Sequence, residues 1–367
     1  MEMNGEIKTI FKIGLSVLAS LSYTYFISSK IPQGKLRFFC LLPIFYLFFI
    51  LPLSLSTALP AGVISLFVTW VGTFKLLLFS FGSGPLSSQQ PPKSLLHFIF
   101  IACLPIKTQS SNQRSPEKSS PVSGKPPKVP LNFPTKVVLF SILVALTDYK
   151  HYLHPKLLLV QYGCMLYFFV DIIVGSCNVL MRAALGIELE SPSDEPYLST
   201  SLQDFWGRRW NLMITNILRD TIYKPVRSAM AAFVGSDWAP LPAMLAVFLV
   251  SGLMHELIYY YMTRVTPTWE VTLFFILHGV CLVVEVGMKK VLAPKWRWRW
   301  HWAVSVPMTL GFVAVTAIWL FFPPLVRNGV DAKAIEECKE LLEFIKEKLK
   351  LDCLVSWASL SSIGSVG

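Results

Sequence analysis

Long apolar runs separated by polar stretches set the pattern of this chain. A helix that crosses a membrane needs about 20 predominantly apolar residues. Runs of suitable length occur at residues 9–28, 38–56, 59–81, 157–181, 239–262, 269–288 and 302–323. An eighth run, at residues 136–149, is shorter and spans if its helix starts near Pro134. The pattern predicts an all-α, polytopic membrane helical bundle.

A ninth run, Leu95–Ile106, has about twelve residues and suits a re-entrant or interfacial segment better than a span. Loops rich in Lys and Arg alternate with loops that are poor in them when eight spans are counted. Basic loops face the cytosol, which places both chain ends in the lumen. We expect about eight to nine membrane helices.

Composition supports a membrane protein over a soluble one. The chain of 367 residues is 53% hydrophobic and 15% charged, with a mean hydropathy of +0.54, whereas soluble domains carry roughly 25% charged residues. The net charge of +11 does not indicate nucleic-acid binding, because the basic residues lie in loops between apolar runs. The seven cysteines have no repeated spacing and are interpreted as small buried residues.

Two segments fall outside the apolar pattern. Residues 107–135 are rich in Ser, Pro and Lys and predict a flexible cytosolic loop. In the tail, apolar residues from Ile335 to Leu349 repeat at 3-4 spacing, typical of an amphipathic helix. A helix lying on the membrane or on its own protein is favoured over a coiled-coil dimer, since two heptads are short. We expect one domain at 1–325 and the helix and tail at 326–367.

A histidine lies inside the apolar run Leu241–Tyr261, in the motif SGLMHE. An ionisable residue at membrane depth is costly and usually functional. On a helix, Ser251 and Tyr259 share the face of His255, while Gly252 permits close approach of a backbone or a substrate. Glu256 points elsewhere and is expected to support a neighbouring helix. His255 is interpreted either as a general base or as a core histidine.

The second motif, SLQDFWGRRWN at Ser201–Asn211, combines aromatic side chains with charged ones. Two interpretations fit it: an interfacial anchor, or a site for a phosphate-bearing cosubstrate such as coenzyme A. An asparagine in a buried pocket needs a hydrogen-bond partner. His255 is the candidate partner of Asn211. The residues proposed to hold the cosubstrate are Trp206, Arg208, Arg209, Trp210 and Lys224.

Other ionisable residues also lie within predicted spans. His278 and Glu285 share a helix face and either line a cavity or form a structural pair. Lys75 and Asp171 should face the bundle interior, where a mutual ion pair is one possibility. The motifs HxxxH, HExxH and GxSxG are absent, as is a Gly-rich phosphate loop, so metal-dependent hydroxylation and serine hydrolysis lack their usual residues. We expect no metal site.

At its two motifs the chain resembles the plant wax synthase-type members of the membrane-bound O-acyltransferase superfamily. SLQDFWGRRWN corresponds to the superfamily's FW-x-R-x-WN element, and SGLMHE to the element that carries its catalytic histidine. The segment FKLLLFSFGSGPL at Phe74–Leu86 is also similar to the plant group. The resemblance covers roughly residues 5–325.

The resemblance implies transfer of an acyl group from acyl-CoA to a lipid alcohol in the endoplasmic reticulum membrane, without a cofactor. His255 would be the general base, Asn211 its polar companion, and a lipid tunnel would hold the acyl chain. Long-chain alcohols, sterols and diacylglycerol all remain possible acceptors. A lipid transporter, with His255, His278 and Asp171 along a path, is the alternative from another class, but interrupted helix pairs and repeats typical of transporters are not seen.

Overall fold

The computed structural model describes residues 2–87, 94–104, 131–185, 192–292, 301–340 and 343. These residues form helices joined by short turns, and no strand occurs among them. The expected loop at 107–135 lies largely outside the described residues, as does most of the basic and aromatic stretch 295–302.

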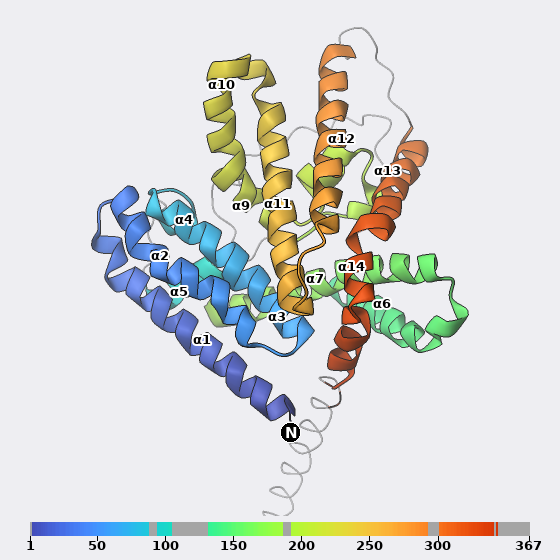
Figure 1. The fold of residues 1–367 in the computed structure, drawn as a ribbon, viewed down its shortest axis with the longest axis horizontal. Helices are drawn as coiled ribbons and strands as arrows, with labels where there is room; N and C mark the ends of the chain where they lie inside the picture. Colours follow the sequence, from blue (N-terminus) through green and yellow to red (C-terminus); the bar gives the residue numbers. More distant parts are fainter. Residues whose placement is uncertain are drawn as a thin grey trace, which may run out of the picture.

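The N-terminal helices make one layer, drawn in blue shades in Figure 1. Its helices are α1 (Glu2–Phe26), α2 (Lys35–Ile50), α3 (Ala58–Ile64), α4 (Thr73–Ser80) and α5 (Leu95–Cys103). Between α3 and α4 the chain continues as a π-helix, η3 (Ser65–Gly72), so that residues 58–80 form one rod. The short turns of this layer are η1 (Ser28–Lys30), η2 (Leu51–Ser54) and η4 (Pro85–Ser87).

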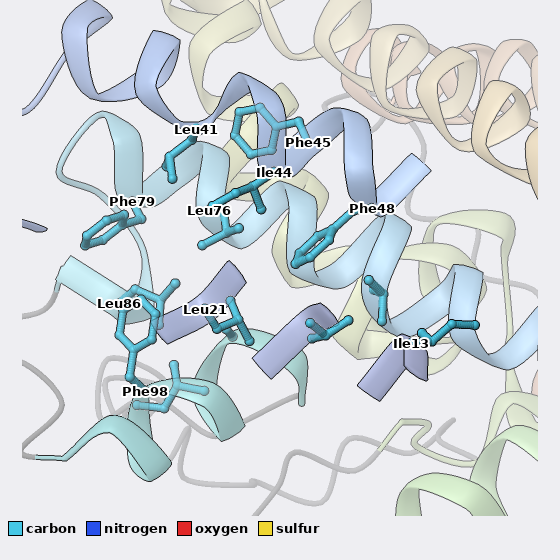
Figure 2. Packing of buried hydrophobic residues seen from close by; sticks show 14 of the residues in the cluster. Ile13, Leu21, Leu41, Ile44, Phe45, Phe48, Leu76, Phe79, Leu86 and Phe98 are labelled. Carbon is cyan, nitrogen blue, oxygen red and sulfur yellow. The ribbon is translucent and has the colours of Figure 1, made fainter. Parts of the chain in front are cut away.

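The core of this layer lies between α1, α2, α4 and α5 (Figure 2). Leu21, Leu41, Phe48 and Leu76 are fully buried there. The outer sides of α1 and α2 leave large apolar side chains exposed, among them Phe11, Leu36, Phe39 and Tyr46. Lipid tails are as apolar as these side chains, so the outer surface fits a membrane environment.

The middle of the chain begins with α6 (Phe133–Leu146), η6 (Thr147–Tyr152) and α7 (Pro155–Leu185). Short elements follow: η7 (Pro196–Leu198), α8 (Leu202–Asp204), the π-helix η8 (Phe205–Arg209), α9 (Leu212–Leu218) and the π-helix η9 (Arg219–Tyr223). They lead into α10 (Lys224–Trp238), which turns at Gly235.

The C-terminal half contains α11 (Pro240–Thr263), α12 (Glu270–Leu292), α13 (Trp302–Thr316), the π-helix η10 (Ala317–Phe321) and α14 (Pro323–Arg327). Helices α10, α11 and α12 stand side by side (Figure 1). Two glycines bring α11 and α12 together. A Cβ on Gly252 would lie 3.0 Å from the Cα of Thr272, and one on Gly279 would lie 2.8 Å from the Cβ of Phe248. Neither position has room for a larger residue without a shift of the helices.

Among the residues that the structure describes, seven helices are long and apolar enough to cross a membrane, and they match the seven long runs of the sequence. The eighth predicted span corresponds to α6, whose 14 residues continue into the 3-10 turn η6. The short run at 95–106 forms α5, a nine-residue helix capped by Ser94 and too short to cross a bilayer. The prediction of a polytopic helical bundle is confirmed.

The suggested ion pair between Lys75 and Asp171 is wrong. The buried Lys75 ammonium donates to the carbonyls of Ile101, at 2.6 Å, and Leu104, at the end of α5. A cation is favourable there because the C-terminal carbonyls of a helix carry partial negative charge. Asp171 instead accepts from Lys136 at 2.5 Å and from Ser193 at 2.7 Å.

The tail helix is described over residues 330–340, and it lies against its own chain. The Glu337 carboxylate accepts from the backbone N–H groups of Ala58 and Leu59, both at 2.7 Å. These groups open α3 and have no partner within the helix, so Glu337 acts as its cap. Lys339 pairs with Asp148 at 2.5 Å. The interpretation as a helix packed on its own protein holds for this part of the tail.

Candidate active site

His255 lies on α11 at a point where two buried clusters meet. Its Nδ1 is 2.7 Å from the carbonyl oxygen of Ser251, one turn earlier. A carbonyl oxygen only accepts, so Nδ1 carries the proton and donates it. A charged ring is costly in an apolar interior, which favours the neutral imidazole. The lone pair of Nε2 is then free to accept a proton from a substrate.

Aromatic rings surround this imidazole. The ring of Phe275 on α12 lies 4.3 Å from it, centroid to centroid. The ring of Trp70 meets it edge to face at 5.1 Å, and that of Phe321 lies at 5.9 Å. The three rings come from η3, α12 and η10, far apart in sequence. They make the surroundings of the imidazole apolar.

Three of the four π-helices in the described ranges supply aromatic rings to this region. Trp70 belongs to η3, Trp206 to η8 and Phe321 to η10. A π-turn inserts an extra residue into a helix and re-aims the side chains that follow, and such turns are frequent at functional sites. Their gathering around α11 and α12 marks this part of the bundle as the candidate site.

The supporting residues of the SGLMHE motif have structural partners. Gly252 allows the α12 backbone to approach at Thr272, so a helix fills the space considered for a substrate. Glu256 is buried and accepts from the Thr272 N–H at 3.3 Å, in the first turn of α12. Tyr259 donates its hydroxyl to the Phe321 carbonyl at 2.9 Å, which fixes the turn that carries the Phe321 ring. Glu256 thus supports the neighbouring helix, as the sequence predicted.

Asn211 caps the start of helix α9 and makes no hydrogen bond with His255 in the described structure. Its backbone has a left-handed conformation (φ 41°), and its side-chain oxygen accepts from the Ile214 N–H at 3.3 Å. Ile214 packs in one cluster with Trp70 and with Met254, the residue before His255. Asn211 therefore sets the start of the helix that supports the histidine's surroundings, rather than bonding to the imidazole.

His278 has both ring nitrogens occupied. Trp206 donates its indole N–H to Nδ1 at 3.0 Å. Thr316 donates its own hydroxyl to the Phe312 carbonyl, so it accepts from Nε2 of His278 at 2.8 Å. The ring is fully buried and joins η8, α12 and α13. Both ring nitrogens are engaged in holding helices together, so neither is free to act as a base.

Glu285 does not pair with His278, although both lie on α12. Its carboxylate accepts from the Leu202 N–H at 2.9 Å and also binds Lys289. One face of α12 is thus hydrogen-bonded to the segment 202–206 at two points, through His278 and Glu285. The suggested pair of His278 and Glu285 is therefore wrong. Each residue instead holds the bundle together through other partners.

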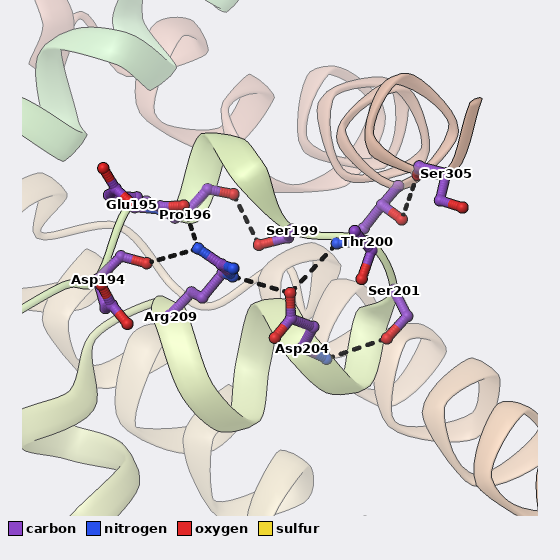
Figure 3. A network of polar contacts seen from close by, with 10 residues as sticks. Asp194, Glu195, Pro196, Ser199, Thr200, Ser201, Asp204, Arg209 and Ser305 are labelled. Atoms are coloured by element: carbon purple, nitrogen blue, oxygen red, sulfur yellow. Dashed lines mark hydrogen bonds and ion pairs between the residues drawn. The ribbon is translucent and has the colours of Figure 1, made fainter. Parts of the chain in front are cut away.

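Arg209 belongs to a polar network at the start of α8 (Figure 3). Its Nε donates to Asp204 at 2.8 Å, and its Nη1 donates to the carbonyls of Asp194 and Glu195 at 3.2 and 3.1 Å. Asp204 also receives the Thr200 N–H, and Ser201 caps the helix by accepting from the Asp204 N–H. The hydrogen bonds of the Arg209 guanidinium therefore go to groups of the protein itself.

The other proposed cosubstrate residues differ in availability. Trp206 uses its N–H on His278, and Trp210 stacks on Phe205 with centroids 5.7 Å apart. Lys224 pairs with Asp220 at 2.6 Å. Arg208 is exposed and makes no hydrogen bond or ion pair with the described residues. Of the basic residues proposed from the sequence, Arg208 alone keeps its charge available to a ligand within the described structure.

Sequence reasoning missed the aromatic neighbours of His255. One signal was present: tryptophans in membrane proteins gather at the two interfaces, whereas Trp70 sits in the middle of the run 59–81. A tryptophan at that depth is unusual and marks a buried role. Phe275 and Phe321 carried no such signal, since phenylalanine is common in spans. Across the described ranges, no group of three His, Cys, Asp or Glu side chains forms a metal site.

Comparison with known proteins supports the same region. A model of the membrane bound O-acyl transferase family matches residues 190–277, which contain both motifs. A long-chain-alcohol O-fatty-acyltransferase from Simmondsia chinensis is 42% identical over 95% of this chain and 98% of its own. An acyl-CoA–sterol O-acyltransferase 1 from Arabidopsis thaliana is 40% identical over 90% of this chain and 94% of its own.

These matches place the chain in the membrane-bound O-acyltransferase family. Within that family it belongs to the branch of the plant long-chain-alcohol O-fatty-acyltransferases. A probable long-chain-alcohol O-fatty-acyltransferase 3 from Arabidopsis thaliana is also 42% identical to it, over 95% of this chain. The resemblance found in the two motifs is thereby confirmed.

Proposed function

We propose that this protein transfers an acyl group from acyl-CoA to the hydroxyl of a long-chain alcohol and so forms a wax ester. The observation that carries the proposal is His255, whose Nε2 is free for a substrate inside a ring of aromatic side chains. A neutral imidazole in this setting is a competent general base for a hydroxyl. The relatives named for long-chain alcohols support this acceptor.

The chemistry is a direct transfer. Nε2 of His255 takes the proton of the alcohol while its oxygen attacks the thioester carbonyl. The tetrahedral intermediate collapses, the C–S bond breaks, and the coenzyme A sulfur leaves and recovers the proton from Nε2. No acylated enzyme is needed, so a nucleophilic Ser or Cys has no role. Asn211 contributes by positioning α9, and acyl-CoA is a substrate rather than a cofactor.

A sterol is the second acceptor to consider, because the sterol-acylating relative is nearly as similar to the chain as the alcohol-acylating ones. Diacylglycerol is a third acceptor with the same chemistry. Lipid transport is not favoured. His278 and Asp171 would have to line a path with His255, yet both are engaged by neighbouring side chains. We place the reaction in the endoplasmic reticulum membrane, where acyl-CoA reaches the cytosolic face.

The acceptor is tested by expression in yeast that lacks its own neutral-lipid synthesis. Cells are fed long-chain alcohols, sterols or diacylglycerol, and their lipids are analysed. We expect wax esters from the alcohol feed at a level far above sterol esters or triacylglycerol. The matched control is His255→Ala at equal protein level. If no feed yields an ester that depends on His255, the proposed activity is wrong, and if sterol esters dominate, the acceptor is wrong.

Arg208 is the residue proposed to contact the phosphates of coenzyme A. Removal of one charge-assisted hydrogen bond changes affinity by roughly tenfold. We expect Arg208→Gln to raise the KM for acyl-CoA by about that factor, with little change in the KM for the alcohol. Steady-state kinetics with each substrate varied in turn measures the difference.

Two further variants complete that measurement. Arg227→Gln removes another exposed charge, on α10, and should leave both KM values unchanged. Arg209→Gln breaks the network around Asp204 and should lower the amount of folded protein. An unchanged KM for acyl-CoA in Arg208→Gln contradicts the assignment, as does an equal rise in Arg227→Gln.

A further inference from the structure

Trp70 carries a buried hydrogen-bond donor that has no partner. The side chain is 1% exposed, and its indole N–H is one of five buried side-chain polar atoms without a hydrogen bond in the described structure. Buried donors are almost always satisfied. A buried donor without a partner beside a candidate site therefore calls for an explanation. One explanation is a ligand that accepts from it only during turnover.

The position of Trp70 is defined by its neighbours. Its ring contacts the His255 imidazole edge to face, with centroids 5.1 Å apart. It packs with Met213 and Met254 and sits in the π-helix η3. The indole nitrogen thus belongs to the ring that contacts the proposed base, and no group of the described structure accepts its proton.

The other polar aromatic side chains around the two histidines have used their donors. Trp206 gives its N–H to His278, and Tyr259 gives its hydroxyl to the Phe321 carbonyl. The transfer proposed above develops negative charge on the thioester oxygen, and such charge requires a donor that is fixed in advance. The indole of Trp70 fits this requirement, because it is held by its packing and its N–H is unused within the described structure.

We propose that Trp70 donates its indole N–H to the carbonyl oxygen of the acyl thioester and stabilises the oxyanion formed from it. The inference rests on the proposed acyl transfer. As the alcohol oxygen bonds to the carbonyl carbon, its proton passes to Nε2 of His255 and the carbonyl electron pair moves to the oxygen held by Trp70. As the C–S bond breaks, the C=O bond is restored and the proton passes from Nε2 to the coenzyme A sulfur.

The first test removes the N–H and keeps an aromatic ring. Loss of one donor to an oxyanion lowers kcat by roughly 10²–10³-fold. We expect Trp70→Phe to lose about that factor in kcat, with KM values for acyl-CoA and alcohol changed less than threefold. Trp238→Phe, at an exposed position on α10, is the matched control and should retain its kcat.

A second variant removes the N–H with almost no change of shape. Trp70→benzothienylalanine, introduced by suppression of an amber codon, keeps two fused rings and replaces N–H by sulfur. It is expected to lose kcat as Trp70→Phe does, while melting at the temperature of the unaltered protein. If this variant keeps its kcat within twofold, the donor role is refuted, whatever happens to Trp70→Phe.

Inhibitors locate the contact on the carbonyl. One acyl-CoA analogue has a ketone in place of the thioester, with CH2 for sulfur, and a second is an S-alkyl thioether without the carbonyl. The loss of N–H should weaken the ketone about tenfold or more and leave the thioether unchanged. Equal weakening of both analogues refutes the contact and leaves Trp70 a packing residue.

The outcome also separates this inference from the function on which it rests. If the unaltered protein forms no ester that depends on His255, the proposed function fails. If it forms esters and both Trp70 variants are fully active, only the donor role fails.

Discussion

Replacement of His255 by Ala is expected to lower the rate of ester formation by about 10²–10⁴-fold, the usual contribution of a general base. Within the described structure the imidazole's hydrogen bond goes to the Ser251 carbonyl of its own helix, so its loss breaks no hydrogen bond between helices. It does open a gap among the rings that pack against it. The melting temperature should therefore fall, but by less than in a variant that also leaves a buried donor unsatisfied. Ester formation per folded molecule, measured in detergent with saturating alcohol and acyl-CoA, checks the first part, and thermal unfolding checks the second.

His255→Gln is the matched variant for that experiment, because it preserves volume and a polar end but lacks a basic nitrogen. It should be as inactive as His255→Ala. Activity near that of the unaltered protein in either variant would show that the base lies elsewhere.

Replacement of His278 by Ala should have the opposite effect: a large loss of stability and little loss of activity per folded molecule. It leaves the Trp206 N–H without an acceptor, deprives Thr316 of a donor and opens a cavity where a fully buried ring stood. An unsatisfied buried donor and a cavity together cost roughly 2–5 kcal/mol. We expect a large fall in melting temperature and yield, while the folded fraction keeps most of its activity at low temperature.

Trp206→Phe is the companion variant, because it removes the donor of the Trp206–His278 hydrogen bond and should destabilise the protein for the same reason. A double variant of Trp206 and His278 should then destabilise by less than the sum of the two single changes. If His278→Ala is stable but inactive, His278 rather than His255 takes part in the chemistry.

The sequence predicted the helices well because their signals are local. Seven runs became seven long helices, and the short run at 95–106 became the short helix α5. Ser201, a residue type common at helix starts, begins α8, and its hydroxyl accepts from the Asp204 N–H. Run length and capping act within a few residues, so one sequence is enough to see them.

The partners of polar side chains were harder to predict, because they depend on how helices meet. Lys75 was paired in prediction with Asp171, yet it caps α5. Asn211 was expected to meet His255, but its left-handed backbone turns its side chain to the N–H of Ile214. Trp70 and Phe321 reach His255 from η3 and η10. Nothing in their local sequence states which distant helix they face.

The cap that Glu337 places on α3 has a consequence for biosynthesis. The rod formed by residues 58–80 carries Trp70, and it enters the membrane while more than half of the chain is still to be translated. Its first N–H groups obtain their carboxylate partner only when residue 337 has left the ribosome. The span that carries Trp70 therefore acquires the cap of its first turn only at the end of synthesis, and ribosomes stalled before that point would hold a bundle whose third span lacks this cap.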